Sequence, residues 1–172
     1  MAFENSKIME GLGGWSISPK MINWIFDNLP QDSIILELGS GYATKLLVEK
    51  YKVYSIEQDP NWMNKYRGSN YIYSPIKDYE NYKWYDLSFI NEIDKNYDLL
   101  LVDGPTQASG GRYGLLEHID KFYNSNAIII FDDVNRKEDL DVMMKLSKKI
   151  NRSFKVIFEP EKQFGICKPK KG

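Results

Sequence analysis

One stretch, residues 34–44, constrains the fold more than any other part of the chain. It reads Ile-Ile-Leu-Glu-Leu-Gly-Ser-Gly-Tyr-Ala-Thr, an apolar run that ends in an acid and leads into a glycine-rich turn. The run is short enough for a buried strand, and Gly39 and Gly41 permit close approach of the backbone to a ligand. A helix that begins near Tyr42 would direct its free N–H groups at that ligand. The stretch therefore predicts a strand, a turn and a helix built around a binding site.

A second acid supports this interpretation. Twenty residues after Glu37, the run Lys-Val-Tyr-Ser-Ile over residues 52–56 ends at Glu57. In nucleotide-binding βαβ units, an acid at the tip of the second strand holds ribose hydroxyls. We therefore expect Glu57 to accept hydrogen bonds from a ribose diol.

The glycine turn by itself is a weak signal, because many strand–turn–helix joints use glycine only to turn. No Gly-Lys-Ser/Thr follows, so the turn is not a phosphate-binding P-loop. Thr44 replaces the third glycine of the dinucleotide motif Gly-x-Gly-x-x-Gly. A plain turn therefore remains the alternative to a cofactor site.

Composition limits the classes of protein. A chain of 172 residues predicts one domain over 1–172. The net charge of −1 and pI of about 5.9 argue against a general nucleic-acid partner, although a local basic patch remains open. A single cysteine, Cys167, excludes a disulfide framework. Without a signal-peptide pattern or a membrane-length apolar run, the expectation is a cytoplasmic protein with no membrane partner.

Apolar runs alternate with helical patterns along the chain. Strands are expected at 33–38, 52–57, 71–73, 98–102, 127–131, 154–158 and 164–168. Helices are expected at 19–28, 42–50, 59–66, 113–123 and 135–150, and in the later part of 77–96. Residues 1–16 have no clear period and are expected to be a flexible or substrate-side lead-in. Several runs are apolar without alternation, which suits strands buried on both faces of a parallel sheet.

The predicted fold class is therefore α/β, a doubly wound sheet with helices on both faces and right-handed crossovers. Only residues 159–163 separate the last two strands, so these should pair as an antiparallel hairpin.

Every long strand of the predicted parallel sheet ends in an acid: Glu37, Glu57, Asp103, and the pair Asp132 and Asp133. Ligands of such sheets bind beyond the carboxyl ends of the strands, at the point where strand order reverses. Neighbouring strands lie about 4.8 Å apart, so Asp103, Asp132 and Asp133 should converge. Hard oxygen ligands of this kind suit Mg²⁺, Ca²⁺ or Mn²⁺. Alternatively, the pair is solvated, or Asp103 is a general base without a metal.

Other residues have two interpretations each. His118, the only histidine, is expected to be a surface or packing residue rather than a catalytic one. Arg112 follows a glycine-rich loop and would bind a substrate carboxylate or phosphate, or act as a helix-entry charge. Trp15, Trp84 and Tyr85 would wall a pocket or, as the default, pack in the core.

The motifs together resemble class I S-adenosylmethionine-dependent methyltransferases. The resemblance covers residues from about 14 to 168 and rests on segments that share one order along the chain: Gly-Trp-Ser, Glu-Leu-Gly-Ser-Gly-Tyr-Ala-Thr, Ser-Ile-Glu-Gln-Asp-Pro-Asn-Trp, Trp-Tyr-Asp, Val-Asp-Gly-Pro and Phe-Asp-Asp-Val. It implies a seven-stranded sheet of order 3-2-1-4-5-7-6. It also implies a donor site made by Glu37, Gly39, Ser40, Gly41, Glu57, Gln58 and Asp103.

The placement of the later acids resembles that in catechol-type, metal-dependent O-methyltransferases. This resemblance implies metal ligands at Asp103, Asp132 and Asp133, with Mg²⁺ as an optional cofactor, and catalytic roles for Asp103 and Asp132. Val-Asp-Gly-Pro is also similar to a segment of polysaccharide-directed methyltransferases, and the chain lacks the Asn/Asp-Pro-Pro-Tyr motif of base-methylating enzymes.

The function implied is O-methylation of a small molecule or a carbohydrate hydroxyl, without a nucleic-acid partner. Either the acceptor is large, or residues 1–16 or the second subunit of a homodimer close the acceptor side. The alternatives are an NAD- or nucleotide-sugar-binding enzyme and a non-catalytic module that has kept the fold.

Overall fold

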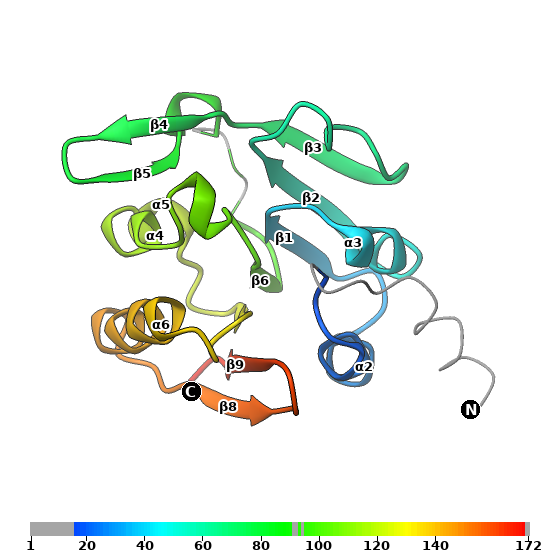
Figure 1. The fold of residues 1–172 in the computed structure, drawn as a ribbon. Helices are drawn as coiled ribbons and strands as arrows, with labels where there is room; N and C mark the ends of the chain where they lie inside the picture. Colours follow the sequence, from blue (N-terminus) through cyan, green and yellow to red (C-terminus); the bar gives the residue numbers. More distant parts are fainter. Residues whose placement is uncertain (1–15, 91–92, 94, 171–172) are drawn as a thin grey trace.

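The computed structural model describes residues 16–90, 93 and 95–170 and contains a seven-stranded sheet (Figure 1). The strands are β1 (Ile34–Leu38), β2 (Lys52–Glu57), β3 (Ser69–Tyr73), β6 (Leu99–Val102), β7 (Ile128–Phe131), β8 (Lys155–Phe158) and β9 (Gln163–Cys167). Their order is β3-β2-β1-β6-β7-β9-β8, and β9 runs antiparallel to both of its neighbours. This confirms the predicted order and the closing hairpin.

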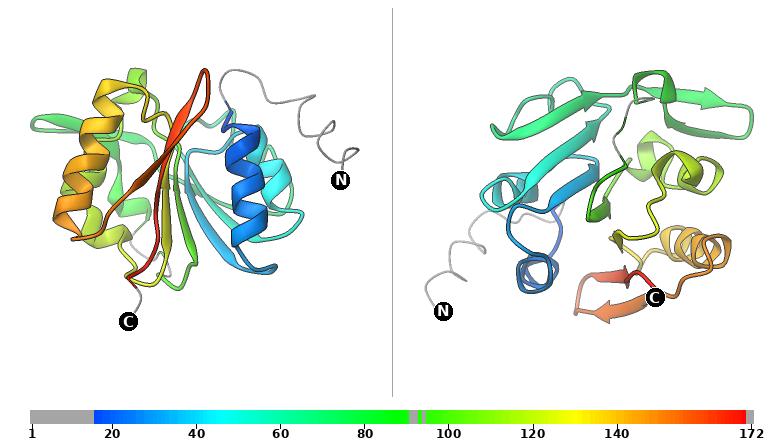
Figure 2. Two further views of the ribbon diagram at one scale, coloured as in Figure 1. Left: turned by 90° about the horizontal axis from the view of Figure 1, so that it is seen from below. Right: turned by 180° about the vertical axis from the view of Figure 1, so that it is seen from behind.

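Helices cover both faces of the sheet, as predicted (Figure 2). The helices α2 (Pro19–Asn28) and α3 (Tyr42–Leu47) pack on one face. The opposite face is covered by α4 (Gly114–Glu117), α5 (Ile119–Phe122) and α6 (Lys137–Lys149). The sheet is therefore the middle layer. The helices pack on its faces, so the ends of its strands stay available for a ligand.

Successive residues of the central strands enter two separate cores. In β1, Ile35 joins the core beneath α2 and α3, whereas Leu36 joins the core beneath α4 to α6. In β6, Leu99 and Leu100 divide in the same way. Side chains of a strand alternate between its faces, so a sheet covered on both sides needs apolar residues at every position. This explains the absence of polar alternation in the sequence.

The first described helix starts where the sequence predicts. Ser18 has extended backbone geometry, and its hydroxyl oxygen accepts a hydrogen bond from the N–H of Met21 at 3.2 Å. Pro19 occupies the first helical position, where its missing N–H costs nothing.

The helix predicted in the later part of 77–96 is wrong. Trp84 and Tyr85 lie in β5 (Tyr82–Tyr85), which pairs antiparallel with β4 (Ile76–Tyr79). Among the described residues between β5 and β6, the only helical turn is the 3₁₀ turn η1 (Leu87–Phe89). Aromatic residues favour strands, and Glu80 and Asn81 form a two-residue connection between the two strands. The apolar residues at 84–90 match a helical period only by coincidence, because burial of Trp84 and Tyr85 against the sheet decides their conformation.

Residues 59–66 also form turns instead of the predicted helix. The carboxylate of Asp59 accepts from the backbone N–H and the side-chain amide of Asn61, both at 2.9 Å. Asn64 has a φ of 58°, which no α-helix contains. Local side-chain hydrogen bonds therefore compete successfully with the helix.

Two further boundaries differ from the prediction. The helix expected at 113–123 is split into α4 and α5 at His118, whose φ and ψ are −115° and 19°. The helix expected at 135–150 begins later, because α6 starts after Arg136, which makes no side-chain cap hydrogen bond. The N–H of Arg136 instead donates to the carbonyl oxygen of Asp133 at 2.9 Å, so the turn after β7 sets where α6 begins.

The predicted lead-in falls outside the described residues, apart from Ser16, and so does Trp15. None of the helices in the described ranges has the length and apolar character required to cross a bilayer. The assignment of the whole chain to one domain stays a prediction.

We expect Gly114→Ala to lower the free energy of unfolding by about 1–3 kcal/mol, the usual range for overpacking a core. A Cβ at position 114 would lie 2.3 Å from Cγ of the fully buried Trp84. Urea unfolding of the two proteins measures the difference. Gly41→Ala is the matched control because a Cβ there meets no atom within 4 Å, and equal losses in both variants would contradict the packing explanation.

Candidate functional site

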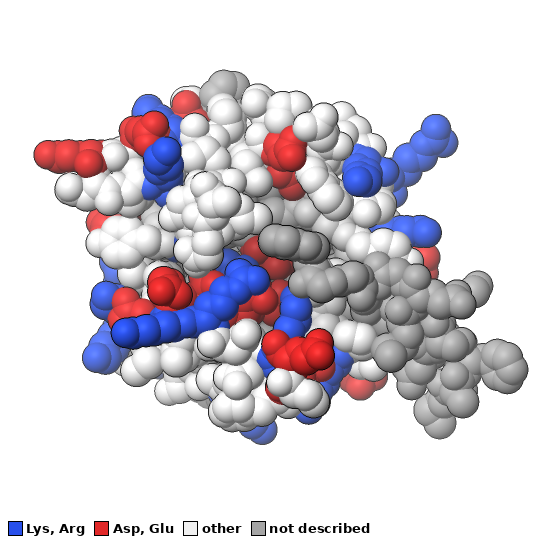
Figure 3. All heavy atoms as spheres, viewed as in Figure 1, with Lys and Arg blue, Asp and Glu red and all other residues white. Residues whose placement is uncertain are grey.

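The candidate site lies at the carboxyl ends of β1, β2, β6 and β7, around the point where strand order reverses between β1 and β6. The face of the molecule shown in Figure 3 has acidic side chains gathered in a central hollow, with basic side chains across them. Two groups of residues build the site. One is the turn after β1 together with Glu57, and the other is the acid cluster, which we define as Asp103, Asp132, Asp133 and Asp139.

The turn after β1 needs glycine at position 39. Gly39 has a φ of 85°, and a Cβ there would lie 3.1 Å from both Cα and N of Gly104. Its N–H donates to the carbonyl oxygen of Ile56 at 2.8 Å. The turn is therefore pressed between β2 and the segment after β6. At Gly41, in contrast, the space beyond the backbone is open.

Glu37 supports this turn from beneath the site. The residue is 2% exposed, and its Oε1 accepts hydrogen bonds from the hydroxyls of Thr44, at 2.7 Å, and Ser55. The Thr44 oxygen in turn accepts from the N–H of Gly41 at 3.0 Å. Burial raises the pKa of Glu37 from 4.5 to about 7, although both hydroxyls lower it. In this structure the predicted donor-site residue Glu37 fixes the turn through Thr44.

Glu57 organises the rim of the same turn. Its carboxylate accepts from four donors: the N–H and hydroxyl of Ser40, at 2.9 and 2.8 Å, and the N–H groups of Gln58 and Asp59, both at 2.9 Å. The structure thus brings Ser40, Gln58 and Glu57 together, as expected. The ribose contact predicted for Glu57 stays a prediction.

Near the turn after β1, two buried polar atoms of the described residues have no hydrogen-bond partner. They are the hydroxyl oxygen of Tyr85 and Oε1 of Gln58. A Cβ on Gly104 would lie 2.9 Å from the Tyr85 hydroxyl, so this group reaches the segment beside Gly39. Burial, and next the nearby charge of Glu57, raise its pKa well above the usual value. Unpaired buried polar groups are costly, and these two suit contacts with a polar ligand.

The predicted metal-ligand residues converge in the acid cluster. One oxygen from each of Asp103, Asp132 and Asp133 lies within 4.8 Å of the others. The Asp132 residue is completely buried, and neither of its carboxylate oxygens has a hydrogen-bond partner. Asp133 has a φ of 57°, which turns the chain sharply after β7. The acids are therefore held in the site and are not the solvated loop acids of the alternative interpretation.

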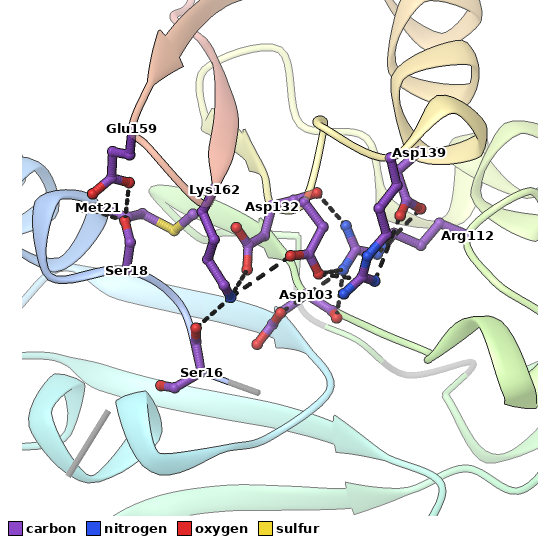
Figure 4. Close-up of polar contacts among 11 residues, drawn as sticks. Ser16, Ser18, Met21, Asp103, Arg112, Asp132, Asp139, Glu159 and Lys162 are labelled. Carbon is purple, nitrogen blue, oxygen red and sulfur yellow. Dashed lines mark hydrogen bonds and ion pairs between the residues drawn. The ribbon is translucent and has the colours of Figure 1, made fainter. Parts of the chain in front are cut away.

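Arg112 joins the members of the acid cluster (Figure 4). Its Nη2 lies 3.2 Å from Asp133 Oδ2 and donates to the carbonyl oxygen of Asp103 at 2.8 Å, and its Nη1 donates to the carbonyl oxygen of Asp132. Its Nε lies 3.7 Å from Asp139 Oδ1. Arg112 is 3% exposed. All these contacts are internal, so neither expectation for Arg112, substrate binding or a helix-entry charge, describes its position.

Lys162 is a site residue that the sequence did not identify. It lies in the turn between β8 and β9, and its Nζ is 3.6 Å from both Asp132 Oδ2 and Asp133 Oδ1 (Figure 4). The same ammonium donates to the carbonyl oxygen of Ser16. No local pattern in residues 159–163 marks this lysine. Only the pairing of β9 with β7 brings it to the acids.

Among the described residues, cations offset most of the negative charge of the acid cluster. Four carboxyl groups of the acid cluster face three cations: Arg112, Arg136 and Lys162. Burial, and next the charge of Asp132, raise the pKa of Asp103 well above its usual value. Burial and the charge of Asp133 likewise raise the pKa of Asp132. These two carboxyl groups are therefore better proton acceptors than ordinary aspartates.

His118 lies outside this arrangement, as the simpler interpretation expected. Its Nε2 is 2.8 Å from the Tyr82 hydroxyl, and its ring packs against Tyr79 and Tyr82. Partial burial lowers its pKa. The residue links α4 and α5 to the β4–β5 hairpin.

No family model and no curated protein matches the sequence. Solved structures do resemble this chain over nearly its whole length. A Pyrococcus furiosus methyltransferase has a TM-score of 0.59 at 18% identity, covering 98% of this chain and 96% of its own. The methyltransferase PaMTH1 of Podospora anserina, solved with S-adenosylhomocysteine bound, has a TM-score of 0.63 at 14% identity, with 99% and 94% covered.

A Staphylococcus aureus protein provisionally assigned as a caffeoyl-CoA O-methyltransferase has a TM-score of 0.59 at 14% identity, with 96% and 90% covered. At such identities the similarity establishes the fold alone. The chain has the Rossmann-like fold of class I S-adenosylmethionine-dependent methyltransferases, as the sequence motifs suggested.

We expect Glu37→Gln to become more stable relative to the wild type as pH rises. The folded-state pKa of about 7 lies above the ordinary 4.5, so the protonated Glu37 stabilises the fold below about pH 4.5, and this contribution is lost by about pH 7. Glutamine keeps an oxygen for Thr44 and Ser55 but does not ionise. The relative gain between about pH 5 and pH 8 should be roughly 3 kcal/mol at most.

Urea unfolding at both pH values measures this change. Glu49→Gln, at an exposed position, is the control and should show no such dependence. A constant difference between wild type and Glu37→Gln would mean that Glu37 ionises normally in the folded protein.

Proposed function

We propose that this protein is an S-adenosylmethionine-dependent methyltransferase that acts on a hydroxyl oxygen of a small molecule or sugar. The observation that carries the proposal is the juxtaposition at one switch point of a glycine turn, held by Glu37 and Glu57, and a buried acid cluster. The first suits a donor with a ribose and an amino acid part, and the second suits removal of a proton from an acceptor. The methyltransferase fold supports this assignment.

On the donor side, the main chain of Gly39, Ser40 and Gly41 would face the methionine part, and Glu57 would accept from the ribose hydroxyls. The unpaired Gln58 Oε1 and Tyr85 hydroxyl offer further polar contacts. Bound S-adenosylmethionine supplies an electrophilic methyl group on a sulfonium. The acids around the switch point favour its positive charge.

On the acceptor side, we assign proton removal to Asp103 and Asp132. The Asp103 side chain is 20% exposed, whereas those of Asp132 and Arg112 are almost fully buried. An acceptor hydroxyl can therefore reach the Asp103 side chain, and its proton can pass to that carboxylate. Arg112 holds the backbone of both acids in place, because its guanidinium binds the carbonyl oxygens of Asp103 and Asp132.

The acid cluster also fits a divalent cation. Its oxygens lie close together, and both Asp132 oxygens are free of hydrogen bonds. Asp103, Asp132 and Asp133 would hold Mg²⁺, which would lower the pKa of the acceptor hydroxyl. The Lys162 ammonium lies 3.6 Å from two of these acids, so a metal ion has to compete with it. We propose that Lys162 and a divalent cation are alternative partners of this cluster.

We therefore expect Lys162→Met to bind Mg²⁺ at least about tenfold more tightly than the wild type, equivalent to about 1.4 kcal/mol. The reason is that the variant loses the ammonium group that lies 3.6 Å from both Asp132 and Asp133. Titration calorimetry with MgCl₂ measures both affinities, and Lys145→Met, on the outer face of α6, is the control. If neither protein binds Mg²⁺, the metal is removed from the proposal and proton transfer to Asp103 alone remains.

Donor binding is tested with two variants of one residue. Gly41 has extended geometry, with a φ of −163°, and open space beyond its backbone. We expect Gly41→Arg to fold normally and to lose S-adenosylhomocysteine binding at least about a hundredfold, because its side chain occupies the donor space. Gly41→Ala should lose much less affinity. Calorimetric titration measures binding, and thermal unfolding checks that each variant is folded.

Binding measurements on the wild type also distinguish the methyltransferase from the alternative functions. Dinucleotide or nucleotide-sugar binding by the wild type, without S-adenosylhomocysteine binding, would replace the methyltransferase proposal. Donor binding without methylation of any member of a broad hydroxyl-acceptor library would favour a non-catalytic module.

A further inference from the structure

A cavity of about 700 Å³ lies at the end of the sheet opposite the acid cluster. The β8–β9 hairpin relates the two places, because its turn carries Lys162, whereas Lys155 and Lys168 at its other end line the cavity. Figure 2 (left) shows this separation: the end of β9 and the end of α6 lie far from the β8–β9 turn. The cavity is therefore distinct from the proposed methyltransferase site.

The charge of the cavity is one-sided. Its lining contains five basic residues and no acid, and the basic residues are Lys148, Arg152, Lys155, Lys168 and Lys170. The whole chain, in contrast, has 23 basic and 24 acidic residues. The nearly neutral net charge of the protein thus conceals a strongly basic local surface.

Arg152 is the central residue of this group. It is 5% exposed, its Nη2 donates to the carbonyl oxygens of Ala127 and Cys167 at 2.8 and 3.0 Å, and its Nε donates to that of Lys168 at 3.2 Å. Its Nη1 has no hydrogen-bond partner. Within the described part of the chain, none of the ion pairs involves Arg152.

The two buried arginines, Arg112 and Arg152, have different partners. Arg112 contacts three carboxylates, whereas the hydrogen bonds of Arg152 within the described ranges go to neutral carbonyl oxygens. A buried charge without a counter-ion is costly. An anion in the adjoining cavity would supply the missing negative charge.

Helix electrostatics do not account for the cluster. Lys148 lies in the last turn of α6, where a cation offsets the helix dipole. Lys155 begins β8 and Lys168 follows β9, so these come from other segments. Tertiary structure has brought exposed lysines from separate elements around one cavity.

The remaining lining is suited to the body of an organic ligand. Trp24, Phe154, Ile157 and Ile166 contribute apolar surface, and Lys168 Nζ lies 5.4 Å from the centre of the Trp24 ring. The volume lies within the range of small-molecule sites. A ligand with an anionic head and an apolar body fits both halves of the cavity.

We propose that this cavity binds a small phosphorylated ligand. Its phosphate group is held by Arg152 and by the lysines at the rim, because guanidinium and ammonium groups are the usual partners of phosphate. Its organic part packs against Trp24. The proposal does not depend on the methyltransferase assignment.

The test is calorimetric titration of the protein with pyrophosphate and with phenyl phosphate. We expect dissociation constants below about 1 mM, and affinity that falls as salt is added. The double variant Lys148→Glu/Lys168→Glu should bind at least tenfold more weakly, since it changes only exposed side chains. Lys145→Glu, on the same helix but outside the cavity lining, should change the affinity by less than twofold.

Two further titrations test whether the phosphate binds in this cavity and whether its source is a small ligand or a polynucleotide. Gly41→Arg should bind pyrophosphate like the wild type, because the donor site is at the other end of the sheet. Equal binding by the double variant and the wild type, or no binding of either probe, would overturn the proposal. A single-stranded RNA oligonucleotide that binds at least tenfold more tightly than pyrophosphate would replace the small ligand with a polynucleotide.

Discussion

The buried contact between Arg112 and the acid cluster holds together the edge of the sheet at which the candidate site lies. Its guanidinium binds backbone oxygens at the ends of both β6 and β7 and lies near a carboxylate of α6. Without it, the four carboxyl groups of the acid cluster would face only Arg136 and Lys162 among the described cations, and their repulsion would drive the strand ends apart. Asp103 and Asp132 can remain close, with raised pKa values, because this cation is fixed between them.

The turn after β1 depends on a different set of contacts. Glu37 lies beneath the site and reaches the turn only through the Thr44 hydroxyl, which accepts from the N–H of Gly41. Thr44 stands where dinucleotide-binding proteins have glycine, and in this protein its side chain has a structural function. The sequence departs from the dinucleotide motif at position 44 because the Thr44 hydroxyl stabilises the turn, which a glycine could not do.

Much of the fold and part of the site could be predicted from the sequence. The apolar runs at 34–38, 99–102 and 128–131 identified the buried strands, because a strand covered on both faces leaves no room for polar side chains. The acids that end them converge because parallel strands end at one edge. The β4–β5 hairpin was missed, since Trp84 and Tyr85 satisfy a helical period as well as a strand, and only packing against α4 distinguishes the two.

The sequence by itself determined the seven strands of the main sheet, the glycine turn and the row of acids at the strand tips, because these depend on local pattern and on the direction of the chain. Only the tertiary structure decided which cations meet those acids. Lys162 and Arg112 lie 50 positions apart along the chain, and Arg152 is as basic as Arg112 in the sequence. Their different surroundings, carboxylates for one arginine and neutral carbonyls for the other, arise because strand pairing and helix packing bring together residues that no local pattern connects.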